Sequence, residues 1–325
     1  MNALNKKLDK FFPFSIPAVI ILGIFIGEPL TNLSAAVPYL FALVTFLGAL
    51  KMSFGDMKAT LRRPKPILLM LLILRLLMPL WALAVGYFLF PADELTRTGL
   101  LLFALIPVGI NSALWTSLFG GNMALSLSVI IIDTLLSPFI LPLSLLLFTG
   151  TSIEMDVLGM MGSLLGMIVI PSIGGMLANG FLKGELPKGL APKFGIASKL
   201  GMVLIVLING GNVASHFQVM DGMLLRIMAA IILLAVSAYS MSWFLAGAGK
   251  FNEADTVSIV FGGGMRNVST GMVLAVAYFP VAVAVPIVAS LLFQQMICAI
   301  FGQLMKVNQS RKAKFAKMMR KELEL

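Results

Sequence analysis

The chain has 325 residues, of which 59% are hydrophobic and only 12% are charged, and its mean hydropathy is +1.00. A soluble core could not bury that much apolar surface, so the composition excludes a soluble protein and places the chain in a lipid bilayer. The net charge of +10 does not require a nucleic-acid partner to explain it. We expect the basic tail to lie against anionic lipid headgroups.

Ten apolar segments follow one another along the chain, and each has about the 20 residues that a helix needs to cross a bilayer. We therefore expect an all-α integral membrane protein with ten transmembrane helices, the first of them uncleaved. The predicted ranges are about 13–29, 34–53, 65–90, 97–119, 121–148, 156–182, 195–215, 223–247, 254–277 and 280–305.

The basic residues predict how these helices are oriented, because lysine and arginine concentrate in cytoplasmic loops. If the N-terminus is cytoplasmic, most of the 24 lysines and arginines fall on the cytoplasmic side. Only Arg97 and Arg226 fall near the outer side. We therefore expect a multi-pass protein of a bacterial-type inner (plasma) membrane, with both termini in the cytoplasm.

The fourth and ninth predicted helices are each interrupted near the middle. The first break reads P-V-G-I-N-S at 107–112, and the second reads G-G-G-M-R-N at 262–267. Because the breaks are five helices apart, two five-helix repeats would insert with opposite orientations, as in many secondary transporters. The expected organisation is a first inverted repeat over 1–150, a second over 151–310, and a basic cytoplasmic tail over 311–325. Unwound backbone in such helices can hold a ligand at mid-membrane.

Three ionisable residues lie inside the apolar segments. Arg75 is near the middle of the third segment, Asp133 is near the middle of the fifth, and Arg266 is in the second break. A charge at the bilayer centre costs about 2.5–3.5 kcal/mol on insertion scales, so each indicates a function. Two arginines and one aspartate leave a net positive site suited to a carboxylate or sulfate. The alternative is a structural arginine–aspartate pair that joins helices, and the sequence leaves open which arginine pairs.

These features together resemble the bile acid:sodium symporter family and its bacterial homologues over roughly residues 10–305. The resemblance is carried by the two breaks and by the segment G-N-M-A-L-S at 121–126, which is its most specific element. It implies a panel domain of spans 1, 2, 6 and 7 and a core domain of spans 3–5 and 8–10. In that family the two broken helices cross in the core beside two sodium ions.

Part of the family's site carries over onto this sequence. The resemblance implies sodium-ligating hydroxyls at Ser112 and Ser126 and an asparagine next to the substrate at Asn267. We expect no cofactor, no metal and no catalytic residue. The candidate substrate and ion site comprises Arg75, Asn111, Ser112, Ser126, Asp133, Arg266, Asn267 and Ser269.

The sequence departs from the family at other sodium ligands. The family's bridging glutamate falls on Gly262 and its following glutamine on Arg266. A further asparagine ligand falls on Ala113 and a threonine ligand on Ile130. A guanidinium offers a sodium ion no oxygen and repels it. We therefore expect the two arginines to stand in for the sodium ions, with Asp133 replacing the lost acidic residue.

The sequence thus predicts a monomeric secondary transporter that moves a small organic anion, such as a bile acid, a steroid-like anion or a smaller carboxylate, by alternating access without sodium. Two alternatives stay open. One is a sodium-coupled symporter with relocated ligands, and the other is a membrane receptor that binds its ligand without moving it. A channel is disfavoured, because no acidic ring or filter motif is visible.

Overall fold

The computed structural model describes residues 15–50, 64–149, 156–182, 190–214 and 222–323, and this part of the chain is helical apart from turns and one isolated backbone bridge. A helix at Ser15–Ile26 comes first. The next elements are η1 (Glu28–Ala36), α2 (Val37–Ala49), α4 (Pro64–Leu72), η2 (Ile73–Leu77), α5 (Met78–Leu89), α6 (Glu94–Leu105), α7 (Asn111–Leu118) and α8 (Met123–Thr149). They are followed by α9 (Val157–Leu164), η3 (Leu165–Val169), α10 (Ile170–Phe181), α11 (Ala191–Asn212), α13 (Gly222–Ala248), α14 (Glu253–Gly264), α15 (Val268–Tyr278) and α16 (Val281–Leu323).

Helices occupy each of the ten predicted ranges, which confirms the all-α prediction. Within the described residues, seven helices are long and apolar enough to cross a membrane on their own. The other three ranges hold the short helix Ser15–Ile26 and the two broken helices, whose halves have between 8 and 12 residues. The number of crossings therefore stays a prediction.

The first half of each broken helix ends at residues that disfavour a helix. Asp93 caps the start of α6 by accepting a hydrogen bond from the Thr96 N–H at 3.0 Å. Pro107 ends α6, because proline lacks an N–H and forces the preceding Ile106 out of the helical region, to ψ 144°. In the second broken helix α14 ends in a run of three glycines, and Met265 after it is extended.

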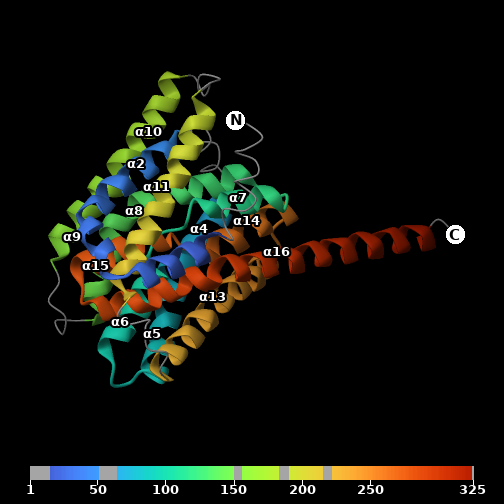
Figure 1. Cartoon of the computed structure of the whole chain (residues 1–325). Coiled ribbons are helices and arrows are strands. Elements are labelled where there is room, and N and C mark those ends of the chain that lie inside the picture. Colours follow the sequence, from blue (N-terminus) through green and yellow to red (C-terminus); the bar gives the residue numbers. More distant parts are fainter. Residues whose placement is uncertain (1–14, 51–63, 150–155, 183–189, 215–221, 324–325) are drawn as a thin grey trace.

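The helices form two groups (Figure 1). One group contains η1, α2, α10 and α11, which pack against one another, and α9 with η3 continues it. The other contains α4 to α8 and α13 to α16. A small residue brings the helix at Ser15–Ile26 close to α11 of the first group: a Cβ at Gly210 would lie 2.8 Å from the Ile20 carbonyl oxygen.

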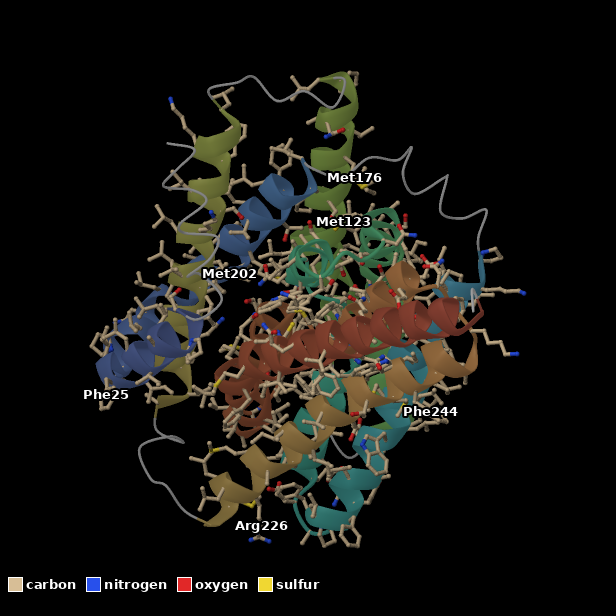
Figure 2. The ribbon with its side chains drawn as sticks, turned by 90° about the vertical axis from the view of Figure 1, so that its right-hand side faces the viewer. Phe25, Met123, Met176, Met202, Arg226 and Phe244 are labelled. Atoms are coloured by element: carbon tan, nitrogen blue, oxygen red, sulfur yellow. The ribbon has the colours of Figure 1, made fainter. Side chains whose placement is uncertain are left out.

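Large apolar side chains cover the outside of the molecule. Figure 2 shows Phe25 and Phe244 pointing away from the body, and they are 83% and 75% exposed. Such a surface is stable in contact with lipid rather than with water.

The last helix differs from the prediction. We expected it to end near residue 305, before a separate tail, but α16 runs for 43 residues to Leu323 and projects from the body (Figure 1). Most of the basic residues that predict the orientation lie in 1–14, 51–63, 183–189 and the tail, where side chains are outside the described part of the structure. The orientation therefore stays a prediction.

Candidate functional site

The two breaks meet at one point in the second helix group. Val108 and Arg266 pair as an antiparallel backbone bridge, and the Asn267 N–H donates to the Pro107 carbonyl at 2.8 Å. Gly109 permits this approach, because a Cβ there would lie 3.0 Å from the Arg266 carbonyl oxygen. The bridge brings the four inner ends of the half-helices together.

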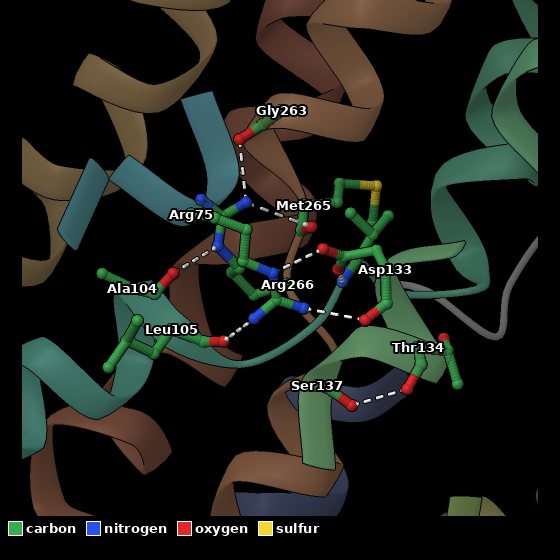
Figure 3. Close-up of polar contacts among 10 residues, drawn as sticks. Arg75, Ala104, Leu105, Asp133, Thr134, Ser137, Gly263, Met265 and Arg266 are labelled. Atoms are coloured by element: carbon green, nitrogen blue, oxygen red, sulfur yellow. Dashed lines mark hydrogen bonds and ion pairs between the residues drawn. The ribbon is translucent and has the colours of Figure 1, made fainter. Parts of the chain in front are cut away.

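Arg75 pairs with Asp133, which answers the question that the sequence left open. Its Nε lies 2.7 Å from Asp133 Oδ1, and its Nη2 donates to the Asp133 backbone carbonyl at 2.9 Å. The other carboxylate oxygen accepts the Val108 N–H at 2.8 Å. This buried aspartate therefore ties η2 to α8 and to the first break, and both of its oxygens are occupied (Figure 3).

The same arginine also reaches the end of a half-helix. Arg75 Nη1 donates to the Leu105 carbonyl oxygen at 2.8 Å, and Leu105 is the last residue of α6. Residues 73–77 form one π-helical turn, a local widening that is often found at functional sites.

Arg266 is 3% exposed and has no carboxylate partner among the described residues. Its guanidinium donates from Nε to the Ala104 carbonyl at 3.2 Å and from Nη1 to the Gly263 carbonyl at 2.8 Å (Figure 3). Its Nη2 is buried without an acceptor in the described part of the chain. The Arg266 side chain thus points into the protein, onto backbone oxygens of both broken helices.

Both guanidinium groups therefore sit on helix C-termini. Leu105 and Ala104 end α6, and Gly263 belongs to the last turn of α14. A helix C-terminus carries a partial negative charge because its last carbonyls have no intrahelical donors. In transporters with broken helices, such C-terminal ends are where coupling cations bind.

Gln294 on α16 fixes the backbone of the second break. Its Oε1 accepts the Arg266 N–H at 3.2 Å, and its Nε2 donates to the Arg266 carbonyl at 3.1 Å. The sequence signal for Gln294 was weak, since an amide within an apolar segment often only joins helices. Here the amide replaces the helical hydrogen bonds that the break removes.

A narrow cavity separates the two helix groups beside the crossing. About 30 Å³ of it is open to the centre of a water-sized sphere, which is room for one or two water molecules. Asn267 lines the cavity, whereas Arg75, Asp133 and Arg266 do not. The lining comprises Thr45, Ala49, Ile168, Ser172 and Met176 from the first group and Val108, Ile110, Ile130, Ile131, Thr134, Leu135 and Asn267 from the second.

The predicted polar residues outside the charged cluster are less closely grouped. Ser126 on α8 donates to Thr116 Oγ1 at 3.0 Å, and the Ser112 hydroxyl is buried without a partner in the described residues. Asn111 begins α7 but does not line the cavity. Ser269 faces the other helix group, with its hydroxyl 3.3 Å from Met202 Sδ on α11.

Apolar groups fill three of the positions onto which the resemblance places other sodium ligands: Gly262, Ala113 and Ile130. A Cβ at Gly262 would overlap the terminal methyl of Met70, which is fully buried. Ala113 and Ile130 lie with Met70 in one hydrophobic cluster. These apolar side chains offer a sodium ion no oxygen ligands.

The motif at 121–126 joins the two broken helices at their outer ends. Asn122 Nδ2 donates to Asp255 Oδ1 at 2.7 Å, and the Asn122 N–H donates to the Ala254 carbonyl at 3.0 Å. Asn252 Nδ2 binds the second carboxylate oxygen of Asp255, also at 2.7 Å. The turn between α7 and α8 is therefore clamped to the start of α14.

A comparison with protein-family models identifies the family of this chain. Residues 38–219 match the model described as the Sodium Bile acid symporter family. The chain belongs to this family. It is therefore a multi-pass membrane transporter and not an enzyme.

Relatives support this assignment along most of the chain. YbaS of Bacillus subtilis (strain 168) is 40% identical over 293 residues, which cover 90% of this chain and 96% of YbaS. YocS of the same organism, whose name describes a sodium-dependent transporter, is 27% identical and covers 82% of this chain and 81% of YocS. The probable sodium/metabolite cotransporter BASS2 of rice chloroplasts is 26% identical and covers 78% of this chain and 58% of BASS2.

Proposed function

We propose that this transporter moves a small organic anion between the two helix groups, and that it does so without sodium. The observation that carries the proposal is the position of the two guanidinium groups on the C-terminal carbonyls of α6 and α14. A bound cation would need those backbone oxygens, and here permanent side-chain cations already use them.

The anion would bind at the helix N-termini of the same crossing, which carry the opposite partial charge to the C-termini that the two guanidinium groups contact. The N-termini of α7 and α15 lie at the breaks, and each carries the partial positive charge of a helix N-terminus. Ile110 and Asn267, which precede these half-helices, both line the cavity. Within the described residues the Asn267 side chain makes no capping hydrogen bond, so its amide can donate to a ligand. Helix N-termini of this kind favour carboxylate and sulfate groups.

Arg266 would act on the anion from behind the bridge rather than by direct contact. Its own backbone lies beside Asn267, but its guanidinium points away from the cavity. Its charge offsets the C-terminal dipoles that would otherwise weaken the attraction for an anion. The apolar remainder of the lining suits an anion with a hydrophobic body, such as a bile-acid-like, steroid-like or branched carboxylate.

Transport would require the two helix groups to move apart. The cavity has room for only one or two water molecules and is too small for an organic anion, so loading would need separation along α2 and α10 on one side and α8 and α15 on the other. In this proposal each broken helix counts as one crossing, giving ten crossings in inverted repeats over 1–150 and 151–310 with cytoplasmic termini. Rocking of one group on the other would then expose the cavity to each side in turn.

One observation favours a second candidate, a sodium-coupled symporter. The hydroxyls of Ser112, Thr116 and Ser126 are buried on the facing parts of α7 and α8, and the Ser112 hydroxyl has no partner in the described residues. A relocated sodium ion could use these oxygens. The names of the family and of YocS also refer to sodium.

The test uses purified protein in two steps. First, a panel of organic anions is screened in sodium-free choline buffer for compounds that raise the unfolding temperature. Second, the uptake of the best compound into proteoliposomes is compared under a sodium gradient and under a choline gradient. We expect equal uptake in both. Uptake that depends on the sodium gradient would refute sodium independence and support the hydroxyl site.

Variants place the anion site. Asn267→Ala should weaken anion binding about tenfold, as expected for one lost hydrogen bond to a charged group. The control is Asn179→Ala, because Asn179 donates to the Leu50 carbonyl and does not line the cavity. Arg266→Gln should weaken binding, while Arg266→Lys, which keeps the charge, should retain most of it. Equal binding by all four variants would place the site elsewhere.

A further inference from the structure

A second, polar cavity lies at the far ends of α5, α6 and α8, away from the crossing. About 220 Å³ of it is open to the centre of a water-sized sphere, several times more than in the cavity beside Asn267. Residues from three helices line it: Leu83, Tyr87, Glu94, Arg97, Thr98, Leu101, Phe148 and Thr149. Its walls therefore carry both charges and two hydroxyl-bearing threonines.

The Arg97 side chain is held in place by the protein. Its Nη1 donates to the carbonyl oxygens of Phe90, at 3.1 Å, and Pro91, and its guanidinium carbon lies 4.7 Å from the centre of the Tyr87 ring. Gly86 lets α5 lie close to the Arg97 side chain of α6, since a Cβ at Gly86 would lie 3.3 Å from Arg97 Cγ. The remaining guanidinium nitrogens have no acceptor among the described residues. A fixed cation with free donors thus borders the cavity.

Glu94 and Thr98 complete the polar wall on the same face of α6. Glu94 precedes Arg97 by three residues, yet it forms no ion pair with Arg97 or with any other described residue. Thr98 is 1% exposed, and its hydroxyl is buried without a hydrogen-bond partner in the described part of the chain. A buried hydroxyl without a partner costs free energy, so a ligand that binds it is favoured.

We propose that this cavity binds the headgroup of phosphatidylethanolamine. The zwitterion fits the two charges: the phosphate would accept from the free Arg97 donors and from Thr98, and the ammonium would donate to Glu94. Soluble phosphoethanolamine shares this chemistry, but the surroundings favour a lipid. Phe88 and Leu147 adjoin the lining residues Tyr87 and Phe148 in sequence, and they are 85% and 76% exposed apolar side chains, suited to acyl chains. Tyr87 is 57% exposed, as is common at membrane interfaces.

Glutamate gives the site its selectivity among lipids. A phosphatidylcholine headgroup has the same phosphate, but its methylated ammonium has no N–H to donate to a carboxylate. A phosphatidylglycerol headgroup has no ammonium, so it would leave Glu94 unpaired. The site should therefore prefer phosphatidylethanolamine over both.

The experiment measures lipid binding to the purified full chain by native mass spectrometry, with the three lipids carrying identical acyl chains. We expect a preference of about tenfold for phosphatidylethanolamine over phosphatidylcholine in the wild type, and nearly none in Glu94→Gln. Thr98→Val should weaken binding of all three lipids. Arg97→Lys keeps the charge and is expected to retain part of the preference.

Two surface variants serve as controls. Glu28→Gln and Arg226→Gln remove an exposed acid and an exposed base outside the cavity, and neither should alter the preference. A wild type without lipid preference, or a Glu94→Gln variant that keeps it, would overturn the proposal. Full displacement of the lipid by millimolar phosphoethanolamine would overturn the assignment to a lipid. These outcomes are independent of the anion site, because no residue is shared between the two cavities.

Discussion

Removing the cation from the Arg75–Asp133 pair should destabilise the transporter severely. Asp133 is fully buried, and without Arg75 its carboxylate would keep one hydrogen bond, from the Val108 N–H at 2.8 Å. Breaking a buried pair by deleting one partner costs about 3–5 kcal/mol, because an uncompensated charge remains. We therefore expect Arg75→Met to lower the free energy of unfolding by about that amount.

The double variant Arg75→Met/Asp133→Asn separates this effect from lost packing. It removes both charges, while the asparagine side-chain oxygen can still accept the Val108 N–H. We expect it to cost about 1–2 kcal/mol, less than Arg75→Met alone, since neutral replacement of a buried pair is well tolerated.

The assay is reversible unfolding in mixed micelles, followed by the fluorescence of the three tryptophans. The coupling free energy follows from the wild type, the two single variants and the double variant. A double variant that is as unstable as the sum of the single variants would show no coupling. That result would refute the conclusion that this pair holds the first break in place.

Two further predictions concern the same broken helices. Asn122→Ala removes the hydrogen bond to Asp255 Oδ1 and the one that Asn122 Oδ1 accepts from the Leu125 N–H at 3.1 Å. It should lower the free energy of unfolding by about 1–3 kcal/mol in the same micelle assay. The control is Ser237→Ala, which removes an exposed hydroxyl on α13. Gly264→Ala should lower the free energy of unfolding by about 1–3 kcal/mol, because the added Cβ would overlap the Tyr239 ring. Gly247→Ala meets open space and should be neutral or stabilising. Equal effects of the two substitutions would contradict the packing described at the second break.

Several features of the fold could be predicted because they depend on local chemistry. Pro107 directly follows the end of α6, and the glycine run at 262–264 forms the last turn of α14, so both breaks lie at residues that weaken a helix. The burial of Asp133 also follows from its place in an apolar segment. These properties need no knowledge of how the helices pack.

Other features depend on how helices are rotated against one another, which periodicity alone does not give. Both arginines lie near the middle of an apolar segment, yet only Arg75 pairs with Asp133. The backbone bridge turns the Arg266 side chain toward the carbonyls of Ala104 and Gly263 instead. The sequence placed Arg266 in the candidate substrate and ion site, and its guanidinium lies outside the cavity lining.

The cavity itself was also beyond sequence reasoning. Thr45 and Ser172 come from distant helices of the first group, and a hydroxyl in an apolar segment gives no sign that it lines a cavity. Similarly, the motif at 121–126 marked the family without showing its role, which is the contact of Asn122 with Asp255.

The most direct measurement of the central idea is the effect of sodium on anion binding by the wild-type protein. The affinity for the best anion from the screen would be measured in sodium chloride and in choline chloride at equal ionic strength. If Arg75 and Arg266 take the place of sodium, the two affinities should be the same, because a cation that does not bind cannot be linked to the anion. An anion affinity that rises tenfold or more with sodium would contradict this account.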